Sequence, residues 1–261
     1  MIRALRCELT RLMNPALILG GMGLMVFFGL LSTTVLFYTV GSGSAALPNT
    51  GRITLAALEA SDGMFAGMQD FVGMLGVITL VVWAMGATTD YSSGLIRLLV
   101  QAEPSRWRLL LGKVVALTAF TCVAMLVTVL IVVPLAPPIA DMTGVSTDAW
   151  SSGMLGTVVA GYLQLTLSVL LWGVVGLLVG MVTKSSGIAI GIGIGYLMLF
   201  EGLAGMLLES TAKWLPGEVF GAIASGGTAD MGYPTALIIG AGYAVAALAA
   251  SVIMSRRDVT A

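Results

Sequence analysis

Side chains that commonly do enzyme chemistry are scarce in this sequence. Its 261 residues include no histidine, and its two cysteines are Cys7 and Cys122. The lack of histidine excludes a Ser-His-Asp triad and a histidine metal site within this chain. Two cysteines, one in the polar N-terminus and one in an apolar run, form neither a disulfide framework nor a cysteine-rich zinc site. We therefore expect a non-catalytic chain with no metal and no cofactor of its own.

The sequence also lacks the usual motif for binding ATP. A P-loop has the pattern GxxxxGK[ST], in which backbone N–H groups and the lysine hold the phosphates. Gly112 and Lys113 are followed by Val114, and no glycine stands five positions before Gly112. An ATP-driven activity would therefore need ATP and magnesium to be bound by a separate subunit.

One ionisable residue, Glu201, stands inside a long apolar run, IGYLMLFEGLAGMLL. An ionisable group in lipid costs roughly 2.5 kcal/mol or more, so this side chain should face protein or water. Two interpretations remain open. Glu201 is either a polar point on a substrate path or gate, or a structural hydrogen-bonding group in a neighbouring-helix contact or near the outer interface. Gln164, Thr166 and Ser168 are its candidate partners.

The composition indicates an integral membrane protein. Hydrophobic residues make up 58% of the chain and charged residues 10%, and the mean hydropathy is +1.02. A soluble domain has roughly a quarter of its residues charged. A hydrocarbon core about 30 Å thick needs about 20 helical residues to cross it. We predict a single all-α domain over residues 1–261 with six transmembrane helices, at about residues 15–40, 63–87, 109–133, 154–182, 188–208 and 234–254.

Residues 1–13 have the pattern of an amphipathic helix that lies in the membrane interface. Ile2, Leu5, Leu9 and Leu12 recur at helical spacing. The polar residues of this predicted interfacial helix are Arg3, Arg6, Glu8 and Arg11. The alternative is a frayed basic tail. The apolar run that follows is too long for a cleaved signal and predicts a retained anchor.

The basic residues orient the six predicted spans. Of the twelve Lys and Arg residues, ten fall on the side that holds both termini. These ten are Arg3, Arg6, Arg11, Arg97, Arg106, Arg108, Lys113, Lys184, Arg256 and Arg257, and only Arg52 and Lys213 fall on the other side. Because cytoplasmic loops carry the excess of Lys and Arg, we expect both termini in the cytoplasm of a multi-pass protein of the cell membrane.

Two rows of glycines mark the predicted fourth and fifth spans. Small residues at every third or fourth position let another helix approach closely. The rows are Gly173, Gly176 and Gly180 on the fourth span, and Gly187, Gly191 and Gly195 on the fifth. Because only a few residues join the two spans, we expect the two helices to pack on each other as an antiparallel pair. We expect residues 219–224, after the fifth span, to form a short helix that dips into the interface.

The loop between the second and third spans carries a family resemblance. It reads DYSSGLIRLL, then Pro104-Ser-Arg106, then Gly112-Lys113 at the entry to the third span. This order of an acid, a glycine, an arginine, a Pro-x-Arg and a Gly-Lys resembles the signature of the type 2 ABC exporter permeases. Ile96 replaces the small polar residue that is usual there. Glu8-Leu-Thr-Arg11, Trp214-Leu-Pro-Gly217 and an acid late in the fifth span, Glu201, also resemble family features.

The resemblance implies how such a chain would work. Two permease copies, a homodimer or a pair with a related permease, would sit above two separate ATPase subunits that bind ATP and magnesium. Residues 93–101 would form a cytoplasmic coupling helix that rests on the ATPase, and the interfacial helix would make a second contact. Ser92 or Ser93 can cap such a helix. Its contact residues would be Ser93, Leu95, Ile96, Arg97, Leu98, Leu99 and Gln101.

The sequence therefore predicts the permease subunit of an ATP-driven exporter. The resemblance is greatest to small permeases that export drugs, antibiotics or lantibiotics. The apolar, methionine-containing spans favour a hydrophobic or amphipathic cargo such as a drug, a peptide or a lipid. The alternative is a standalone six-span channel or secondary carrier, against which the lack of a row of membrane acids and histidines argues.

Overall fold

The structure is a computed structural model that describes residues 15–41, 53–92, 106–201, 203, 207 and 209–257. These residues are helical apart from turns and an isolated antiparallel bridge between Gly227 and Gly232. The elements are α2 (Pro15–Leu17), the π-helix η1 (Ile18–Met22), α3 (Gly23–Gly41), α4 (Leu55–Leu58), the 3₁₀-helix η3 (Gly63–Phe65), α5 (Ala66–Asp70), α6 (Val72–Ser92), α8 (Arg106–Thr143), the 3₁₀-helix η4 (Asp148–Ser151), α9 (Met154–Thr183), α10 (Ser186–Gly195), the π-helix η5 (Tyr196–Glu201), α12 (Glu209–Ala212), α13 (Pro216–Ala224) and α14 (Tyr233–Arg257). The prediction of an all-α protein is confirmed for the described residues.

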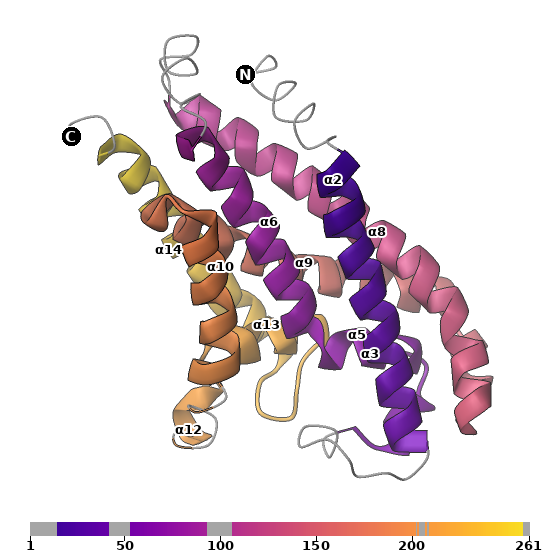
Figure 1. Cartoon of the computed structure of the whole chain (residues 1–261). Coiled ribbons are helices and arrows are strands. Elements are labelled where there is room, and N and C mark those ends of the chain that lie inside the picture. The colour runs from indigo at the N-terminus through magenta and orange to yellow at the C-terminus, as the bar shows by residue number, and fades with distance from the viewer. Residues whose placement is uncertain are drawn as a thin grey trace.

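Five of the described helical stretches are long and apolar enough to cross a membrane, so the chain is a membrane protein. They are Ile18–Gly41, Val72–Thr89, Leu109–Thr143, Met154–Thr183 and Tyr233–Met254. The predicted fifth span corresponds to a shorter apolar stretch, Ser186–Glu201, which spans about 24 Å at 1.5 Å per residue. The long helices run between two ends of the molecule, with α2 and the last turn of α14 at the same end (Figure 1).

Two predicted boundaries differ from the structure. The third span, predicted to end at about residue 133, continues to Thr143 as part of α8, and Pro134, Pro137 and Pro138 lie inside this helix. Proline removes one backbone donor, but packing here outweighs that loss, because Ala136 and Ala140 are fully buried in the main core cluster. The predicted second span is divided instead. Phe71 leaves the helical conformation (φ −101°, ψ 21°), so that α5 is separate from α6.

The four helices α3, α6, α8 and α9 form two parallel pairs that build most of the core. Along η1 and α3, the space beside Gly21 is filled by Phe120, that beside Gly29 by Thr128 and that beside Gly41 by Thr143. In these contacting pairs the residue numbers of both helices increase together, so α3 and α8 run in the same direction. The same reasoning makes α6 and α9 parallel, as expected for alternate crossings of a membrane.

The α6–α9 contact is the most extensive one between described helices, and it depends on glycine. The pairs are Gly76 with Trp172, Leu80 with Gly176, and Ala84 with Gly180, each separated by 96 positions, and Phe65 of η3 meets Gly161 in the same register. A Cβ atom on Gly176 would collide with the Leu80 backbone, and one on Gly173 would collide with the Trp83 ring. Glycine therefore lets these two backbones approach at distances that no other residue permits.

The helices of the predicted fourth and fifth spans, α9 and α10, contact each other as expected, but not through their two glycine rows. Gly173, Gly176 and Gly180 face α6, whereas Cβ atoms added to Gly187, Gly191 and Gly195 would meet nothing within 4 Å in the described structure. On α10 it is Gly193, outside the predicted row, that lies against Leu80 of α6. The glycine row of α9 makes close contacts because Trp83 and Leu80 of α6 fill the space that these glycines leave.

This packing predicts different effects for two glycine substitutions in the same helix. Gly176→Ala should lower the free energy of unfolding by about 1–3 kcal/mol, because the added methyl group overpacks the α6–α9 contact. Gly156→Ala, in the first turn of α9 where nothing lies within 4 Å, is the matched control and should leave stability unchanged or slightly higher. Thermal unfolding of the two purified variants in detergent measures the difference. Equal losses for both would contradict the close packing described above.

Candidate functional site

Glu201 ends η5 and makes a hydrogen bond to a helix on another part of the chain. Its carboxylate oxygen Oε1 accepts the backbone N–H of Gly217 at 2.6 Å. Gly217 is the second residue of α13, and a Cβ atom there would collide with the carboxylate. Tyr196, in the same π-helix, lies close enough to Glu201 to interact with its carboxylate. The carboxylate is therefore held between its own helix and the start of α13.

This contact works as an N-cap supplied from a distance. The first N–H groups of a helix have no partner within the helix, and a negative charge near them is favourable. Leu215 occupies the N-cap position of α13 and makes no side-chain capping bond, and Pro216 follows it at the first helical position. Glu201 supplies the missing acceptor. Of the two interpretations of Glu201, this geometry favours a structural hydrogen bond.

The three residues expected to bind Glu201 have other positions. Ser168 donates its hydroxyl to the carbonyl of Phe220 at 2.8 Å, and the Gln164 side chain lies against Gly226. The hydroxyl of Thr166 is buried and has no partner among the described residues. Two of the three polar groups thus contact α13 or the turn after it, and none of the three is seen to bind Glu201.

An aromatic cluster surrounds α13 at this level. Phe220 of α13 lies edge-on to Trp172 of α9 at 5.2 Å between ring centroids and to Tyr243 of α14 at 6.0 Å. Trp172 also contacts Tyr196 at 6.3 Å. Such edge-to-face pairs contribute about 0.5–1.5 kcal/mol each beyond their buried area. The cluster joins α9, η5, α13 and α14 around one short helix.

A second group of buried hydrogen bonds joins α6 to α8 near the predicted loop. The Nζ atom of Lys113 donates to the carbonyl of Gly86 at 2.7 Å, and Lys113 is only 8% exposed. Further along, Nε1 of Trp83 donates to Oγ1 of Thr121 at 3.0 Å, and both residues are 1% exposed. We call these two bonds the α6–α8 clasp. They join the helices on either side of residues 93–105.

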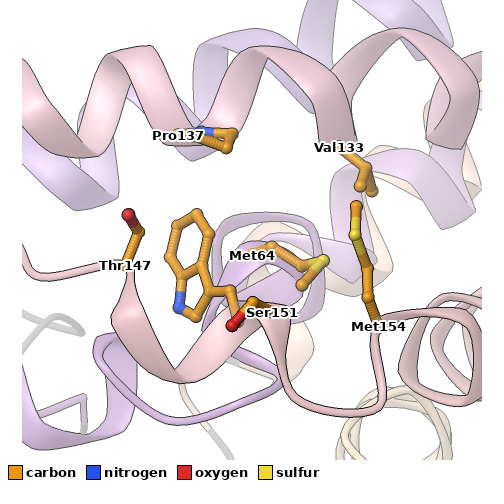
Figure 2. Close-up of a pocket in the computed structure, with 7 residues that line it drawn as sticks. Met64, Val133, Pro137, Thr147, Ser151 and Met154 are labelled. Carbon is orange, nitrogen blue, oxygen red and sulfur yellow. The ribbon is translucent and has the colours of Figure 1, made fainter.

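A small apolar pocket lies where η3, η4 and the two long helices α8 and α9 come together (Figure 2). Its volume is about 190 Å³, and its lining residues are Met64, Val133, Pro137, Thr147, Trp150, Ser151 and Met154. Val133 and Met154 point toward each other across one side of it (Figure 2). Drug-sized ligands occupy about 300–1,000 Å³, so this pocket has room for one alkyl or aromatic group rather than a whole molecule of that size.

Sequence patterns missed this pocket because its lining comes from three separated stretches of the chain. The nearest sequence signal is the proline-rich stretch just after the predicted end of the third span, which contains Pro137. Trp150 is fixed at the pocket by its Nε1 atom, which donates to the carbonyl of Leu58 at 3.0 Å, and by an edge-on contact with Phe37. No group of three or more potential metal ligands occurs among the residues that the structure describes.

The predicted contacts with an ATPase lie outside the described residues. These are the interfacial residues Arg3, Arg6, Glu8 and Arg11, and the coupling residues Ser93, Leu95, Ile96, Arg97, Leu98, Leu99 and Gln101. Both sets remain predictions. The structure describes the helices that flank the second set, α6 and α8.

Comparison with known protein families gives one match. The family described as "Protein of unknown function (DUF2705)" matches residues 22–260, which is most of the chain. No curated protein matches the sequence. The matched range includes the α6–α8 clasp, Glu201 and α13.

The α6–α8 clasp predicts a specific energetic coupling. Thr121→Val keeps the side-chain shape but leaves the Trp83 indole N–H buried without an acceptor, which should cost about 1–3 kcal/mol of stability. Thr128→Val is the matched control, because the Thr128 hydroxyl bonds only to the carbonyl of Ala124 in its own helix. Thermal unfolding of the two variants should show the larger loss for Thr121→Val.

A double variant separates the hydrogen bond from other effects of the Thr121 substitution. Trp83→Phe removes the donor, so adding Thr121→Val to it should cost clearly less than Thr121→Val costs alone. Additive losses in this double-mutant cycle would show that the bond between Trp83 and Thr121 contributes nothing to holding α6 against α8.

Proposed function

We propose that this chain, which belongs to the DUF2705 family, is the membrane permease subunit of an ATP-driven exporter of the type 2 ABC class. The observation that carries the proposal is the segment between α6 and α8. Its sequence, from Asp90 to Lys113, resembles the coupling region of such permeases, and its flanking helices are joined by the clasp. The chain has no P-loop, so the ATPase would be a separate subunit.

The clasp gives the proposed coupling a physical basis. A force applied to residues 93–101 would reach α6 and α8 together, because Lys113 holds the carbonyl of Gly86 across the two helices. From α6 the force would reach α9, because the glycine contacts leave little room for these helices to slide independently. The helices α6, α8 and α9 would thus move as one unit when the ATPase pair closes.

The number of membrane crossings and the side on which the termini lie belong to the same proposal. Ser186–Glu201 would be the sixth membrane crossing, counted with the five long helices, and would place both termini in the cytoplasm. Residues 1–13 would lie along the cytoplasmic interface. The exposed glycines of α10, Gly187 and Gly191, would be available to a second permease copy, because small residues favour close helix contacts in lipid.

The cargo that fits these surfaces is hydrophobic or amphipathic. The spans expose many large apolar side chains, and the described residues of the bundle contain few charged groups. An ionic cargo would need polar groups along its path to replace its lost hydration. The export of a drug, an antibiotic peptide or a lipid from the cytoplasm or the inner leaflet matches this chemistry.

Charge and polarity changes in the coupling segment test the proposal. Arg97→Glu or Leu98→Asp should reduce co-purification with the proposed ATPase subunit. Either change should also reduce the ATP hydrolysis that the permease stimulates, about tenfold or more, since one lost interface anchor costs about 1.4 kcal/mol or more. The matched control, Lys213→Glu, reverses a charge on the opposite side of the predicted membrane and should leave both measurements unchanged. Unchanged assembly and hydrolysis in both coupling variants would refute the coupling assignment.

Reconstitution separates this function from the alternative. The purified chain in liposomes should neither conduct ions nor transport an amphipathic dye until the ATPase and ATP are added. Transport or conductance by the chain alone would identify a channel or secondary carrier.

A further inference from the structure

We propose that the apolar pocket beside η3 and η4 is a binding site for a cationic amphiphile, a molecule that carries one aromatic or branched alkyl group next to a positive charge. The inference goes beyond the exporter proposal and does not rest on it, because such binding needs neither an ATPase nor a nucleotide. It rests on the size of the pocket, on its depth in the membrane and on the charges around it.

The size and the walls of the pocket suit a single apolar group. Its volume of about 190 Å³ exceeds the roughly 150 Å³ of an apolar cavity that holds one benzene molecule. Trp150 is a preformed wall, because its indole is held by the carbonyl of Leu58 and by the ring of Phe37. The flexible thioether side chains of Met64 and Met154 adjust the remaining wall to groups of different shape.

The depth of the pocket suits a molecule that is apolar at one end only. Val133 lines the pocket and lies 24 positions after Leu109, where the apolar stretch of α8 begins. This separation corresponds to about 36 Å along the helix at 1.5 Å per residue. Because a hydrocarbon core is about 30 Å thick, the pocket lies at its boundary or just beyond it. A group bound in the pocket would therefore leave the rest of its molecule in contact with water.

The side chains around the pocket are acidic. Asp62 directly precedes η3, and Asp148 begins η4. Asp141 follows the lining residue Pro137 by four positions and therefore lies one turn further along the same face of α8. Glu59 joins these three acids, because its Oε1 atom accepts a backbone N–H group just before η4 at 3.5 Å. The pocket thus has four carboxylates close to its lining.

These carboxylates favour a cation over a neutral or an anionic molecule. None of the four forms an ion pair with a lysine or arginine that the structure describes. Lys113 and Lys184 lie at the opposite ends of α8 and α9. A concave site with charges of one sign raises the local concentration of the opposite ion. The same charges disfavour an anionic phospholipid, whose phosphate would lie beside them.

Two adjacent serines provide a site-resolved test. In a background with Cys7→Ser and Cys122→Ser, Ser151→Cys places a thiol in the pocket lining, and Ser152→Cys places one next to it, outside the lining. Both native serines are exposed. The purified chain in an uncharged maltoside detergent is treated with methyl methanethiosulfonate, an uncharged thiol reagent. Benzyltrimethylammonium is the cationic probe, benzyl alcohol the neutral one and benzylsulfonate the anionic one.

The cationic probe should protect the pocket selectively. Benzyltrimethylammonium should slow the modification of Ser151→Cys but not that of Ser152→Cys. Benzyl alcohol should need a concentration about threefold or more higher for the same protection, and benzylsulfonate a higher one still, because the acids lie within a Debye length of about 8 Å. Met154→Trp, at a half-exposed position of the lining, fills the pocket without adding a group to the core and should abolish the protection.

Substitution of the acids separates charge from shape. Asp62→Asn combined with Asp141→Asn should raise the half-protecting concentration of benzyltrimethylammonium about threefold or more, and should leave that of benzyl alcohol unchanged. The matched control, Asp230→Asn, removes an exposed acid before α14 that is not near a lining residue in the sequence, and should change neither value.

Four results would overturn the proposal. Absence of protection at Ser151→Cys would show that the site does not exist. Equal protection by the three probes would show that the pocket takes apolar groups, such as a lipid chain, without regard to charge. Equal protection at Ser152→Cys, or protection that survives Met154→Trp, would place the probe outside the pocket. Equal effects of Asp230→Asn and the double variant would show that the surrounding acids select nothing. None of these results bears on the exporter proposal, because no ATPase or nucleotide is present.

Discussion

The close approach of α6 and α9 is the contact on which the remaining structure depends. Glycines on each helix receive large side chains of the other, with Gly76 under Trp172 and Gly173 under Trp83. In lipid there is little hydrophobic gain from bringing two apolar helices together, so the contact relies on van der Waals packing over a large, complementary surface. Because Trp172 also contacts Phe220, and Trp83 also binds Thr121, the same two indoles connect this pair to α13 and to α8.

The sequence predicted those features that depend on amino-acid composition or on the cost of burying a charged group. Low charge and long apolar runs predicted an all-α membrane protein, and the cost of an acid in lipid singled out Glu201. The partner of Glu201 was not predictable in this way, because it is a backbone N–H group, which carries no side-chain signal. The Leu-Pro-Gly sequence at residues 215–217 did carry a usable signal, since proline is favoured at the first position of a helix.

Other expectations failed because local patterns do not identify their partners. The glycine rows of α9 and α10 look equivalent in sequence, yet only the α9 row meets bulky side chains, which come from α6 rather than from the adjacent helix. The three prolines of α8 weaken its backbone bonding, but Ala136 and Ala140 lie in a core formed with α3 and η3 that keeps the helix continuous. In both cases the deciding contacts come from segments far away in the chain.

The length of α8 has a consequence for the shape of the molecule at the membrane surface. Its 38 residues extend over about 57 Å at 1.5 Å per residue, which exceeds a hydrocarbon thickness of about 30 Å. One part of α8 must therefore rise into the headgroup region or beyond it. The short elements that pack beside its proline-containing end form a raised ledge with it, and the apolar pocket belongs to this ledge. The lipid headgroups would thus meet a step in the protein surface.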